Sequence, residues 1–331
     1  MSAQVAVIGG GAWGTALAQM LASDGRAVIL WAREPEVVEN INTYHRNDHF
    51  LPNALLAETI TATGTIEDLR GIPVVLVVTP AQHMGAVLAQ LPDQPRDLVL
   101  CSKGIEQSSG RLMNDVASQA CPRSTVAVLS GPTFAHEVAD GLPTAVTLAC
   151  SGGETQWDRL SPEIARIAFR PYYSFDVAGA EIGGAVKNVL AIACGVVDGL
   201  GLGQNARAAL IARGYAEMLR FGESYGAKAE TLAGLCGLGD LVLTCSSVSS
   251  RNFSLGKALG EGQSATDLMA DRKTVAEGAH TAPVLAELAR TRGIAMPIVD
   301  AVNMLLTGSS AGEVVQQLLA RPLKREQESK A

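Results

Sequence analysis

Three glycines near the start of the chain have the spacing of a phosphate-binding turn. Gly9, Gly11 and Gly14 follow the apolar run Val5–Ile8 and precede the alanine-rich stretch Thr15–Ala18. In a strand-turn-helix setting the first glycine permits the tight turn, the second lets the backbone approach a pyrophosphate, and the third lets the helix pack on the sheet. The N-terminus of that helix then faces the anion. The pattern predicts a dinucleotide site, and the alternative is a plain tight turn.

The end of the next apolar run bears on which dinucleotide is bound. An acidic side chain about 20 residues past the glycines commonly holds the ribose 2′-hydroxyl of NAD. Ala32 and Arg33 occupy that place, and an arginine can pair with the 2′-phosphate of NADP. The neighbouring Glu34 leaves NAD open. We therefore expect NADP or NAD as the cofactor, against the plainer interpretation of Arg33 as a solvated residue at a strand end.

Lys187 has surroundings that predict catalysis. Its neighbours at helical spacing are Gly183, Gly184, Leu190, Ala191 and Cys194. Most helical lysines lie on solvated faces, but a face made of these small and apolar residues is improbable as an exposed one. An ammonium held there loses hydration and its pKa falls, which makes it a competent proton donor and acceptor near neutral pH. We predict that Lys187 is a general acid/base.

A second polar group lies further along the chain. Asp240 stands within Gly237–Thr244, and Ser250, Arg251 and Asn252 follow it. A carboxylate near the predicted catalytic lysine would keep the amine charged and oriented, while Arg251 and Asn252 offer the donors that a phosphate monoester requires. The alternative is a glycine turn with Asp240 as a helix N-cap, followed by a serine-rich loop. Asp240 could serve both roles.

Two further strand ends carry candidate substrate contacts. Leu98–Leu100 runs into Lys103, and Thr125–Leu129 runs into Gly131 and Thr133. Ligands in open α/β sheets bind beyond the carboxyl ends of the strands, so these residues are placed to meet a small anionic substrate. The alternatives are a surface lysine and an ordinary Gly-Pro turn.

The elements that must position these residues change character along the chain. Short apolar runs fill the first half: Val5–Ile8, Ala27–Trp31, Val74–Val78, Leu98–Leu100, Thr125–Leu129, Ala145–Leu148 and Pro171–Phe175. Most are apolar at every position, which is typical of parallel strands covered by helices on both faces. Helix-period stretches alternate with them. We predict an α/β fold with an N-terminal Rossmann-type, doubly wound parallel sheet.

After about Asp176 the strand-like runs stop. The remainder shows helical patterns broken by glycine-rich turns at Gly199–Gly203, Gly234–Gly239 and Gly260–Gly262. This predicts an all-α C-terminal domain, and we divide the chain into residues 1–178 and 179–331. The tail Arg321–Ala331 is mostly polar and charged, so we expect it to be solvated.

Composition excludes several classes of protein. The 331 residues carry a formal charge of −7, without the basic footprint of a nucleic-acid binder. The longest apolar run, Val189–Val197, falls short of the roughly 20 residues that span a bilayer, so we expect no membrane insertion. The six cysteines form no C-x-x-C pair, as in a protein of the reducing cytoplasm. The five histidines lack metal-ligand spacing, and no metal is expected.

Together these segments resemble the bacterial NAD(P)-dependent glycerol-3-phosphate dehydrogenases. The similarity is carried by Val5–Leu17, Ser102–Glu106, Ser130–Ala135, Glu181–Val189, Gly237–Leu241, Ser250–Asn252 and Val275–Gly278. It covers nearly the whole chain except the tail. The resemblance implies reversible hydride transfer between a nicotinamide and C2 of dihydroxyacetone phosphate, which gives sn-glycerol 3-phosphate for glycerophospholipid synthesis. A homodimer is compatible with it.

The resemblance also implies roles for individual residues, with Lys187 as the proton donor and acceptor. The positions that match substrate contacts of the family are Lys103, Gly131, Thr133, Lys187, Asp240, Ser250, Arg251 and Asn252. Beside the three glycines, those that match its cofactor contacts are Trp13, Arg33, Lys103, Ala135, Arg251, Val275 and Glu277.

Two other functions stay open on the sequence. One is a different two-domain reductase, for a hydroxyacid or a ketopantoate-like substrate, which would share the glycine turn and a helical lysine. Ser250, Arg251 and Asn252 argue against it, because such a substrate has no phosphate to bind. The other is a non-catalytic NAD(P)H sensor, which would have no need of a lysine with a lowered pKa.

Overall fold

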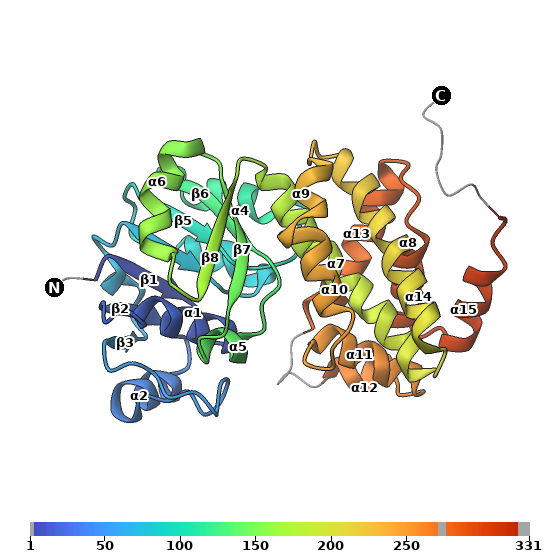
Figure 1. The fold of residues 1–331 in the computed structure, drawn as a ribbon, viewed down its shortest axis with the longest axis horizontal. Coiled ribbons are helices and arrows are strands. Elements are labelled where there is room, and N and C mark those ends of the chain that lie inside the picture. Colours follow the sequence, from blue (N-terminus) through green and yellow to red (C-terminus); the bar gives the residue numbers. More distant parts are fainter. Residues whose placement is uncertain (1–2, 271–275, 324–331) are drawn as a thin grey trace.

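The computed structural model describes residues 3–270 and 276–323. Figure 1 shows two lobes side by side, one built around a sheet and one made of helices. The chain passes from the first lobe to the second along α7 (Val177–Gly199). The predicted division after residue 178 falls in the first turn of this helix and stays a prediction. Of the predicted solvated tail, residues 321–323 are exposed and residues 324–331 lie outside the described part.

An eight-stranded sheet forms the first lobe, in the order β3-β2-β1-β4-β5-β6-β7-β8. Its strands are β1 (Val5–Ile8), β2 (Val28–Trp31), β3 (Ile60–Thr63), β4 (Val74–Val77), β5 (Asp97–Leu100), β6 (Thr125–Ser130), β7 (Thr144–Cys150) and β8 (Phe169–Ser174). Neighbouring strands are parallel except β6 and β7, which are antiparallel. The predicted doubly wound architecture is confirmed, but the sheet is mostly rather than wholly parallel. Strand β3 is an addition to the predicted set.

Helices cover both faces of the sheet, which explains why its inner strands are apolar at every position. In β1, Val5 and Val7 belong to one buried cluster, whereas Ala6 and Ile8 belong to another on the opposite face. The covering helices are α1 (Ala12–Ala22), α2 (Pro35–Tyr44), α3 (Met84–Leu88), α4 (Met113–Ala120), α5 (Ala135–Ala139) and α6 (Gly153–Ile164). Two 3₁₀ turns, Ile66–Leu69 and Ala81–His83, complete the lobe.

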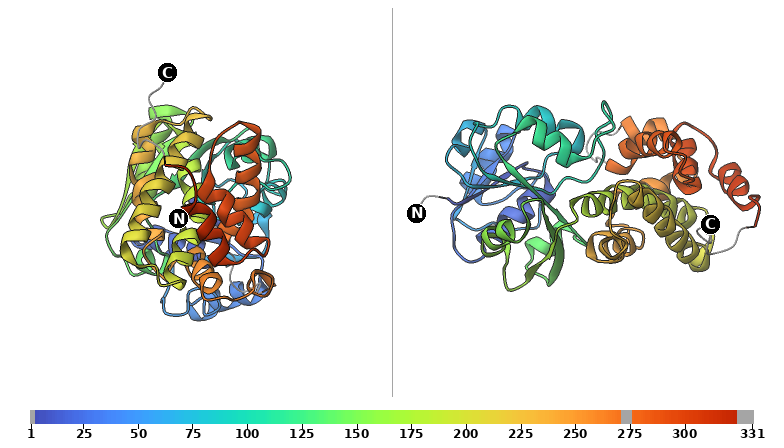
Figure 2. Two further views of the ribbon diagram at one scale, coloured as in Figure 1. Left: turned by 90° about the vertical axis from the view of Figure 1, so that its right-hand side faces the viewer. Right: turned by 90° about the horizontal axis from the view of Figure 1, so that it is seen from above.

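Within the described residues the second lobe is helical, as predicted (Figure 2). Its other helices pack mostly against α7. These helices are α8 (Gly203–Glu223), α9 (Ala229–Ala233), α10 (Asp240–Thr244), α11 (Arg251–Gly260), α12 (Ala265–Ala270), α13 (Glu277–Thr291), α14 (Pro297–Leu306) and α15 (Ala311–Leu319). The expected glycine turn before α10 is instead a π-helix, Leu235–Gly239. Helix α7 has the length and hydropathy of a membrane span, and its apolar window is entirely buried inside the fold.

Glycines let α7 and α11 pack with their backbones in contact. A Cβ placed on Gly195 would lie 2.0 Å from the carbonyl oxygen of Phe253, and one on Gly256 would lie 1.9 Å from that of Ile192. Both distances are far below van der Waals contact, so neither site accepts a side chain unless the helices separate. This close packing holds α7, the helix that carries Lys187, against α11.

Replacing Gly195 with alanine is expected to destabilise the fold by about 1–3 kcal/mol, because the added methyl group overpacks the α7–α11 contact. The matched control is Gly312→Ala on α15, where a Cβ would meet nothing within 4 Å. There the lower backbone entropy of alanine should leave stability unchanged or raise it by up to about 1 kcal/mol. Thermal unfolding followed by circular dichroism measures both variants, and equal melting temperatures would contradict the close-packing argument.

Candidate active site

The glycine turn leaves open space at the start of α1. Gly9 has φ +123°, and a Cβ on Gly14 would lie 1.8 Å from the carbonyl oxygen of Gly9. Around Gly11, by contrast, a Cβ would meet nothing within 4 Å. Helix α1 has no side-chain cap, so the N–H groups of its first turn remain available to an anion. This geometry fits a dinucleotide pyrophosphate. The predicted contact Trp13 lies half-buried in the same turn.

Arg33 stands immediately beyond β2 at the edge of the glycine turn. Its guanidinium pairs with the carboxylate of Glu34 at 2.8 Å, and its side chain is 77% exposed. The arginine is therefore free to turn toward an added phosphate, while its partner offers a carboxylate to a ribose hydroxyl. Arg33 therefore suits NADP, and its neighbour Glu34 suits NAD.

Arg33→Asp is expected to raise the KM for NADPH by more than tenfold while changing the KM for NADH less than threefold. The reason is that a charge-assisted hydrogen bond to a 2′-phosphate contributes about 1.5–3 kcal/mol and NADH has no such group. Initial-rate kinetics with both cofactors measure the effect. Arg70→Asp, at an exposed arginine paired with Glu67 on the same lobe, is the control. Equal KM changes for the two cofactors would remove Arg33 from the cofactor site.

Lys187 belongs to a buried charge cluster that joins the two lobes. Its Nζ donates to Asp240 Oδ1 at 2.6 Å and to Thr244 Oγ1 at 2.8 Å. Lys103, which follows β5 in the other lobe, donates from Nζ to Asp240 Oδ2, also at 2.6 Å. Asp240 is fully buried and Lys187 is only 6% exposed. One carboxylate thus bridges two ammonium groups that belong to different lobes.

Burial lowers the pKa of Lys187 from its ordinary 10.5 to about 8. Loss of hydration is the largest cause, and the neighbouring ammonium of Lys103 acts in the same direction. The carboxylate of Asp240 opposes both by favouring the charged amine. The amine can therefore give up and regain a proton at a pH close to neutrality.

A short series of contacts connects the glycine turn with this cluster. Gly9 approaches the residue after β4, where its Cβ would lie 3.0 Å from the carbonyl carbon of Val78. The hydroxyl of Ser102 donates to the carbonyl oxygen of Thr79, and Lys103 is the next residue along the chain. On α7, a Cβ on Gly184 would lie 3.2 Å from Cγ of Lys103. The glycine turn and both lysines therefore lie at the same end of the sheet, where the strands β1, β4 and β5 have their carboxyl ends.

The candidate residues after β6 lie beside Lys103. The carbonyl oxygen of Gly131 accepts from Lys103 Nζ at 3.2 Å and from Thr133 Oγ1 at 3.3 Å. A Cβ on Gly131 would lie 2.9 Å from Cα of Val146 on β7, so the backbone can approach this closely only at a glycine. Ala135 begins α5 and is half-buried.

Ser250, Arg251 and Asn252 lie at the N-terminus of α11. The hydroxyl of Ser250 caps this helix by accepting from the N–H of Phe253 at 3.2 Å. Arg251 is exposed, whereas Asn252 is buried and its amide donates to Asn188 Oδ1 at 3.1 Å. The segment thus presents an exposed guanidinium beside a helix N-terminus, which suits an anion.

A cavity of about 220 Å³ opens between the lobes beside Lys103. It is lined by Pro80, Ala81, Gln82, His83, Lys103, Gln107, Glu277, His280 and Thr281. Burial raises the pKa of Glu277, while the positive charges of Arg251 and Lys103 counteract the shift. Glu277 therefore lies within the electrostatic reach of both cations. The other C-terminal candidate, Val275, lies outside the described residues.

Two further residues take part in the site, although neither belongs to the residues predicted from the sequence. Thr244 hydrogen-bonds to Lys187, and its place four residues after Asp240 on a helix is the spacing that could have indicated it. Asn188 holds the amide of Asn252, and no spacing signal links two residues 64 positions apart. Asp240 is the first residue of α10, after the N-cap Gly239, so its alternative role as an N-cap is wrong.

A glycine turn that fits a pyrophosphate, on a Rossmann-type sheet whose carboxyl end lies beside a buried lysine of lowered pKa on a helical lobe, is the arrangement of a two-domain nicotinamide-dependent dehydrogenase. Comparison with known proteins is consistent with that class. Residues 4–156 match the family model "NAD-dependent glycerol-3-phosphate dehydrogenase N-terminus", and residues 176–316 match that of the C-terminus. The chain belongs to the NAD-dependent glycerol-3-phosphate dehydrogenase family.

Individual relatives agree over the whole length. Glycerol-3-phosphate dehydrogenase (NAD(P)+) of Erythrobacter litoralis is 76% identical over all of both chains. Its namesake from Novosphingobium aromaticivorans is 70% identical over 98% of this chain and 99% of its own. The crystal structure of glycerol-3-phosphate dehydrogenase from Coxiella burnetii superimposes with a TM-score of 0.91 at 39% identity, covering 96% of this chain and 98% of that one. The chain is thus an oxidoreductase of this family that uses NAD or NADP.

Proposed function

We propose that this chain catalyses the reversible reduction of dihydroxyacetone phosphate to sn-glycerol 3-phosphate, with Lys187 as general acid/base. The observation that carries the proposal is the buried amine of Lys187, which Asp240 holds at the carboxyl end of the strands, where the glycine turn also lies. The product, sn-glycerol 3-phosphate, would supply the backbone of glycerophospholipids. Membership of the glycerol-3-phosphate dehydrogenase family supports the choice of substrate. The hydroxyacid and ketopantoate reductases and the non-catalytic sensor are not favoured.

The cofactor would be held by residues that fit it in this structure. Gly9, Gly11 and Gly14 leave room for the pyrophosphate, and Arg33 stands where a 2′-phosphate would lie. We assign further contacts to Trp13, Lys103, Ala135, Arg251, Val275 and Glu277. When bound, the nicotinamide supplies the chemistry of hydride transfer.

Lys187 would move the proton that the reaction requires. On reduction its Nζ donates a proton to the carbonyl oxygen at C2, and on oxidation it takes the proton back from the hydroxyl. Asp240 and Thr244 orient the amine, because both accept hydrogen bonds from it. Lys103 shares the same carboxylate and adds positive charge beside the developing alkoxide. A positioned acid of this kind contributes about 10²–10⁴-fold to the rate.

The substrate phosphate would be bound at the N-terminus of α11. Arg251 provides an exposed guanidinium there, and Ser250 and Asn252 lie on either side of it. Gly131 and Thr133 would contact the substrate from the sheet lobe, next to Lys103. Binding energy from the phosphate can then position the carbonyl carbon for reaction.

Turnover tests the proposed substrate directly. NADPH absorbance should fall when dihydroxyacetone phosphate is added to the enzyme, and ketopantoate at the same concentration should give at most about 1% of that rate. NADPH binding without turnover of either compound would instead indicate a sensor. Faster consumption with ketopantoate would contradict the phosphate-binding role of α11.

Arg251→Ala is expected to raise the KM for dihydroxyacetone phosphate about 10- to 100-fold, because a charged hydrogen bond to the phosphate contributes about 1.5–3 kcal/mol. The kcat should change much less, since the proton donor is untouched. Steady-state kinetics at saturating NADPH measure both constants. Arg290→Ala, at an exposed α13 arginine paired with Glu287, is the matched control. An unchanged KM would exclude Arg251 from phosphate binding.

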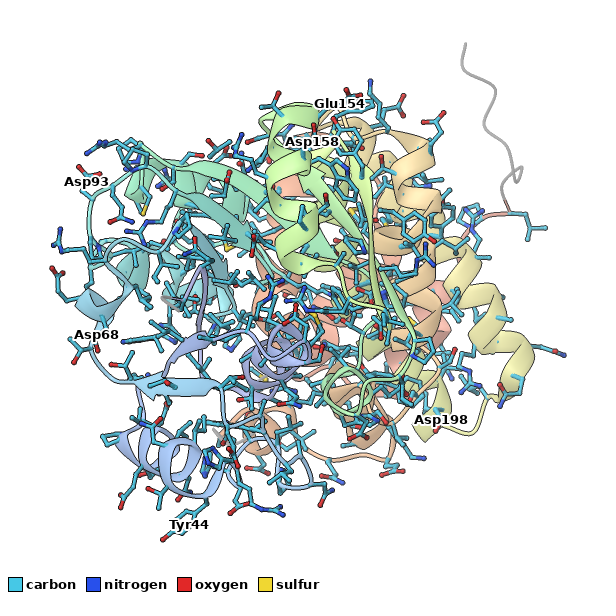
Figure 3. The ribbon with its side chains drawn as sticks, turned by 60° about the vertical axis from the view of Figure 1, so that its left-hand side comes forward. Tyr44, Asp68, Asp93, Glu154, Asp158 and Asp198 are labelled. Atoms are coloured by element: carbon cyan, nitrogen blue, oxygen red, sulfur yellow. The ribbon has the colours of Figure 1, made fainter. Side chains whose placement is uncertain are left out.

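We further propose that the protein acts in the cytoplasm, inserts into no membrane, binds no nucleic acid and forms a homodimer. The net charge of −7 supports the exclusion of nucleic acid, and acidic side chains such as Asp68, Asp93, Glu154 and Asp158 project from the surface (Figure 3). All six cysteines are free, in keeping with a reducing compartment. Among the described residues no group of three or more His, Cys, Asp or Glu side chains could hold a metal.

A further inference from the structure

We propose that the free edge of β8 is a two-fold interface at which a second copy of this chain pairs antiparallel, so that the sheet continues across the dimer. β8 is the last strand in the sheet order and pairs only with β7 (Figure 1). An unpaired edge strand is a template for another strand, and folded proteins usually protect it. The proposal identifies the surface behind the homodimer proposed above and is independent of the reaction.

The opposite edge of the sheet shows how this protein protects a strand that has no neighbour. Strand β3 ends the sheet on that side, and the backbone groups of Ile60 and Ala62 face away from β2. The N–H of Ile60 donates to the carbonyl oxygen of Ala57 at 3.0 Å. The side-chain amide of Asn42 accepts from the N–H of Ala62 at 2.8 Å and donates to its carbonyl oxygen at 2.9 Å. The backbone groups that a second strand would need at Ala62 are therefore already bonded.

The edge of β8 lacks this protection at its centre. The N–H of Thr144 on β7 donates to the carbonyl oxygen of Ala168, so the even-numbered residues of β8 bond to β7 and the odd-numbered ones face outward. Of the outward residues, Phe169 exchanges both its backbone bonds with Arg166. Within the described residues, the N–H and carbonyl of Tyr173, the N–H of Phe175 and the carbonyl of Pro171 have no hydrogen-bond partner.

These free groups are complementary to themselves under a two-fold axis at Tyr173. In that register the two copies of Tyr173 exchange a pair of N–H···O bonds, and the N–H of Phe175 donates to the carbonyl of Pro171 in the other copy. Pro171 has no N–H to return, but the carbonyl of Phe175 needs none because it already accepts from Val177. A slip that places Tyr173 opposite Pro171 would leave the carbonyl of Tyr173 without a donor, because proline has no N–H. A slip that places Tyr173 opposite Phe175 would leave the carbonyl of Pro171 facing Val177, whose N–H already donates to Phe175.

The side chains at this edge are those of an interface rather than of a solvated surface. Ile167 is fully exposed, and Tyr172, Tyr173 and Phe175 are 53%, 37% and 68% exposed. On the face covered by α6, the ring of Tyr173 lies against Trp157 with the ring centroids 5.7 Å apart. Pairing would bring two such aromatic pairs together and remove exposed aromatic surface from water.

Sedimentation velocity at micromolar concentration tests the assembly. The full-length protein should sediment as a dimer. Tyr173→Pro should sediment as a monomer, because the substitution removes the backbone N–H that each copy donates to the other at residue 173. Pro171 shows that an outward position of this strand accepts proline. The control Tyr173→Phe keeps the donor and should remain a dimer. A monomeric wild type, or a Tyr173→Pro dimer of unchanged stability, would overturn the proposal.

Cross-linking tests the register without relying on the proline variant to fold. Residue 173 faces its own copy at a Cα separation of about 5.5 Å, within disulfide range. Tyr173→Cys should therefore form a covalent dimer with a copper-phenanthroline oxidant, in which two thiols lose two electrons and two protons to the oxidant. Tyr172→Cys, one residue out of register, and Tyr44→Cys, at an exposed tyrosine on α2, should cross-link at least tenfold more slowly. Equal rates at all three sites would overturn the proposed register.

Discussion

Replacing Lys187 with alanine is expected to lower kcat for reduction of dihydroxyacetone phosphate by about 10²–10⁴-fold, the contribution of a positioned general acid. The KM for the substrate should change less than fivefold, because the phosphate contacts at α11 remain. Steady-state kinetics at saturating NADPH measure both constants. The amine removed is 6% exposed and hydrogen-bonded to Asp240 and Thr244, so no solvent group stands ready to replace it.

The control for Lys187→Ala is Lys257→Ala, at a lysine of α11 that pairs with Asp198 at 3.0 Å in a partly exposed ion pair. That variant should keep wild-type kcat, and circular dichroism should show that both variants are folded. Small primary amines added to Lys187→Ala should restore part of the rate if the lost group is a proton donor. A Lys187→Ala variant with near wild-type kcat would refute the assigned role.

Asp240→Asn is expected to lower kcat at pH 7 by about 2- to 100-fold, through loss of the protonated amine, and to shift its pH dependence. The carboxylate favours the charged form of Lys187, so removing it lowers the pKa of Lys187 below its present value of about 8. An opposite charge at this distance shifts a pKa by about 1–3 units. Reduction needs the protonated amine, so its kcat/KM should fall as pH rises through that pKa. In the variant the fall should come at least about one pH unit lower.

The kcat/KM for oxidation of sn-glycerol 3-phosphate should change with pH in the opposite direction. Oxidation needs the neutral amine, so its kcat/KM should rise as pH rises through about 8 in the wild type and at lower pH in the variant. Asp198→Asn, which removes an α7 carboxylate paired with Lys257 near the surface, is the matched control and should leave both profiles unchanged. Profiles of Asp240→Asn that coincide with those of the wild type would show that Asp240 does not tune the proton donor.

Much of the fold is predictable because its signals are local. A strand buried on both faces has to be apolar at every position, as β1 and β4 are. Strand β3 was missed because Ile60–Thr63 alternates buried and exposed side chains, in the manner of an edge strand. The antiparallel β6–β7 pair was also missed, because an apolar run carries no direction and the helix between the two strands is only Ala135–Ala139.

The candidate site likewise has one part that local sequence signals predict and one part that they do not. Lys187 could be found because its small and apolar neighbours share one helical face, a signal contained in a single segment. Its ion pair with Asp240 spans 53 residues, and that of Lys103 with the same carboxylate spans 137. No periodicity links positions so far apart, so only the packing of the two lobes brings them together. Val275 and Glu277 entered through family resemblance alone.

Direct titration of the Lys187 amine tests the central claim, that burial prepares it to exchange a proton near neutral pH. Protein labelled with ¹⁵N-lysine would be followed by NMR, with the Lys187 resonance assigned by its absence from the Lys187→Ala spectrum. We predict a pKa of about 8 for this amine. A midpoint at the ordinary lysine value of 10.5 would contradict the account, because the amine would then be a solvated ammonium unable to act as a base at physiological pH.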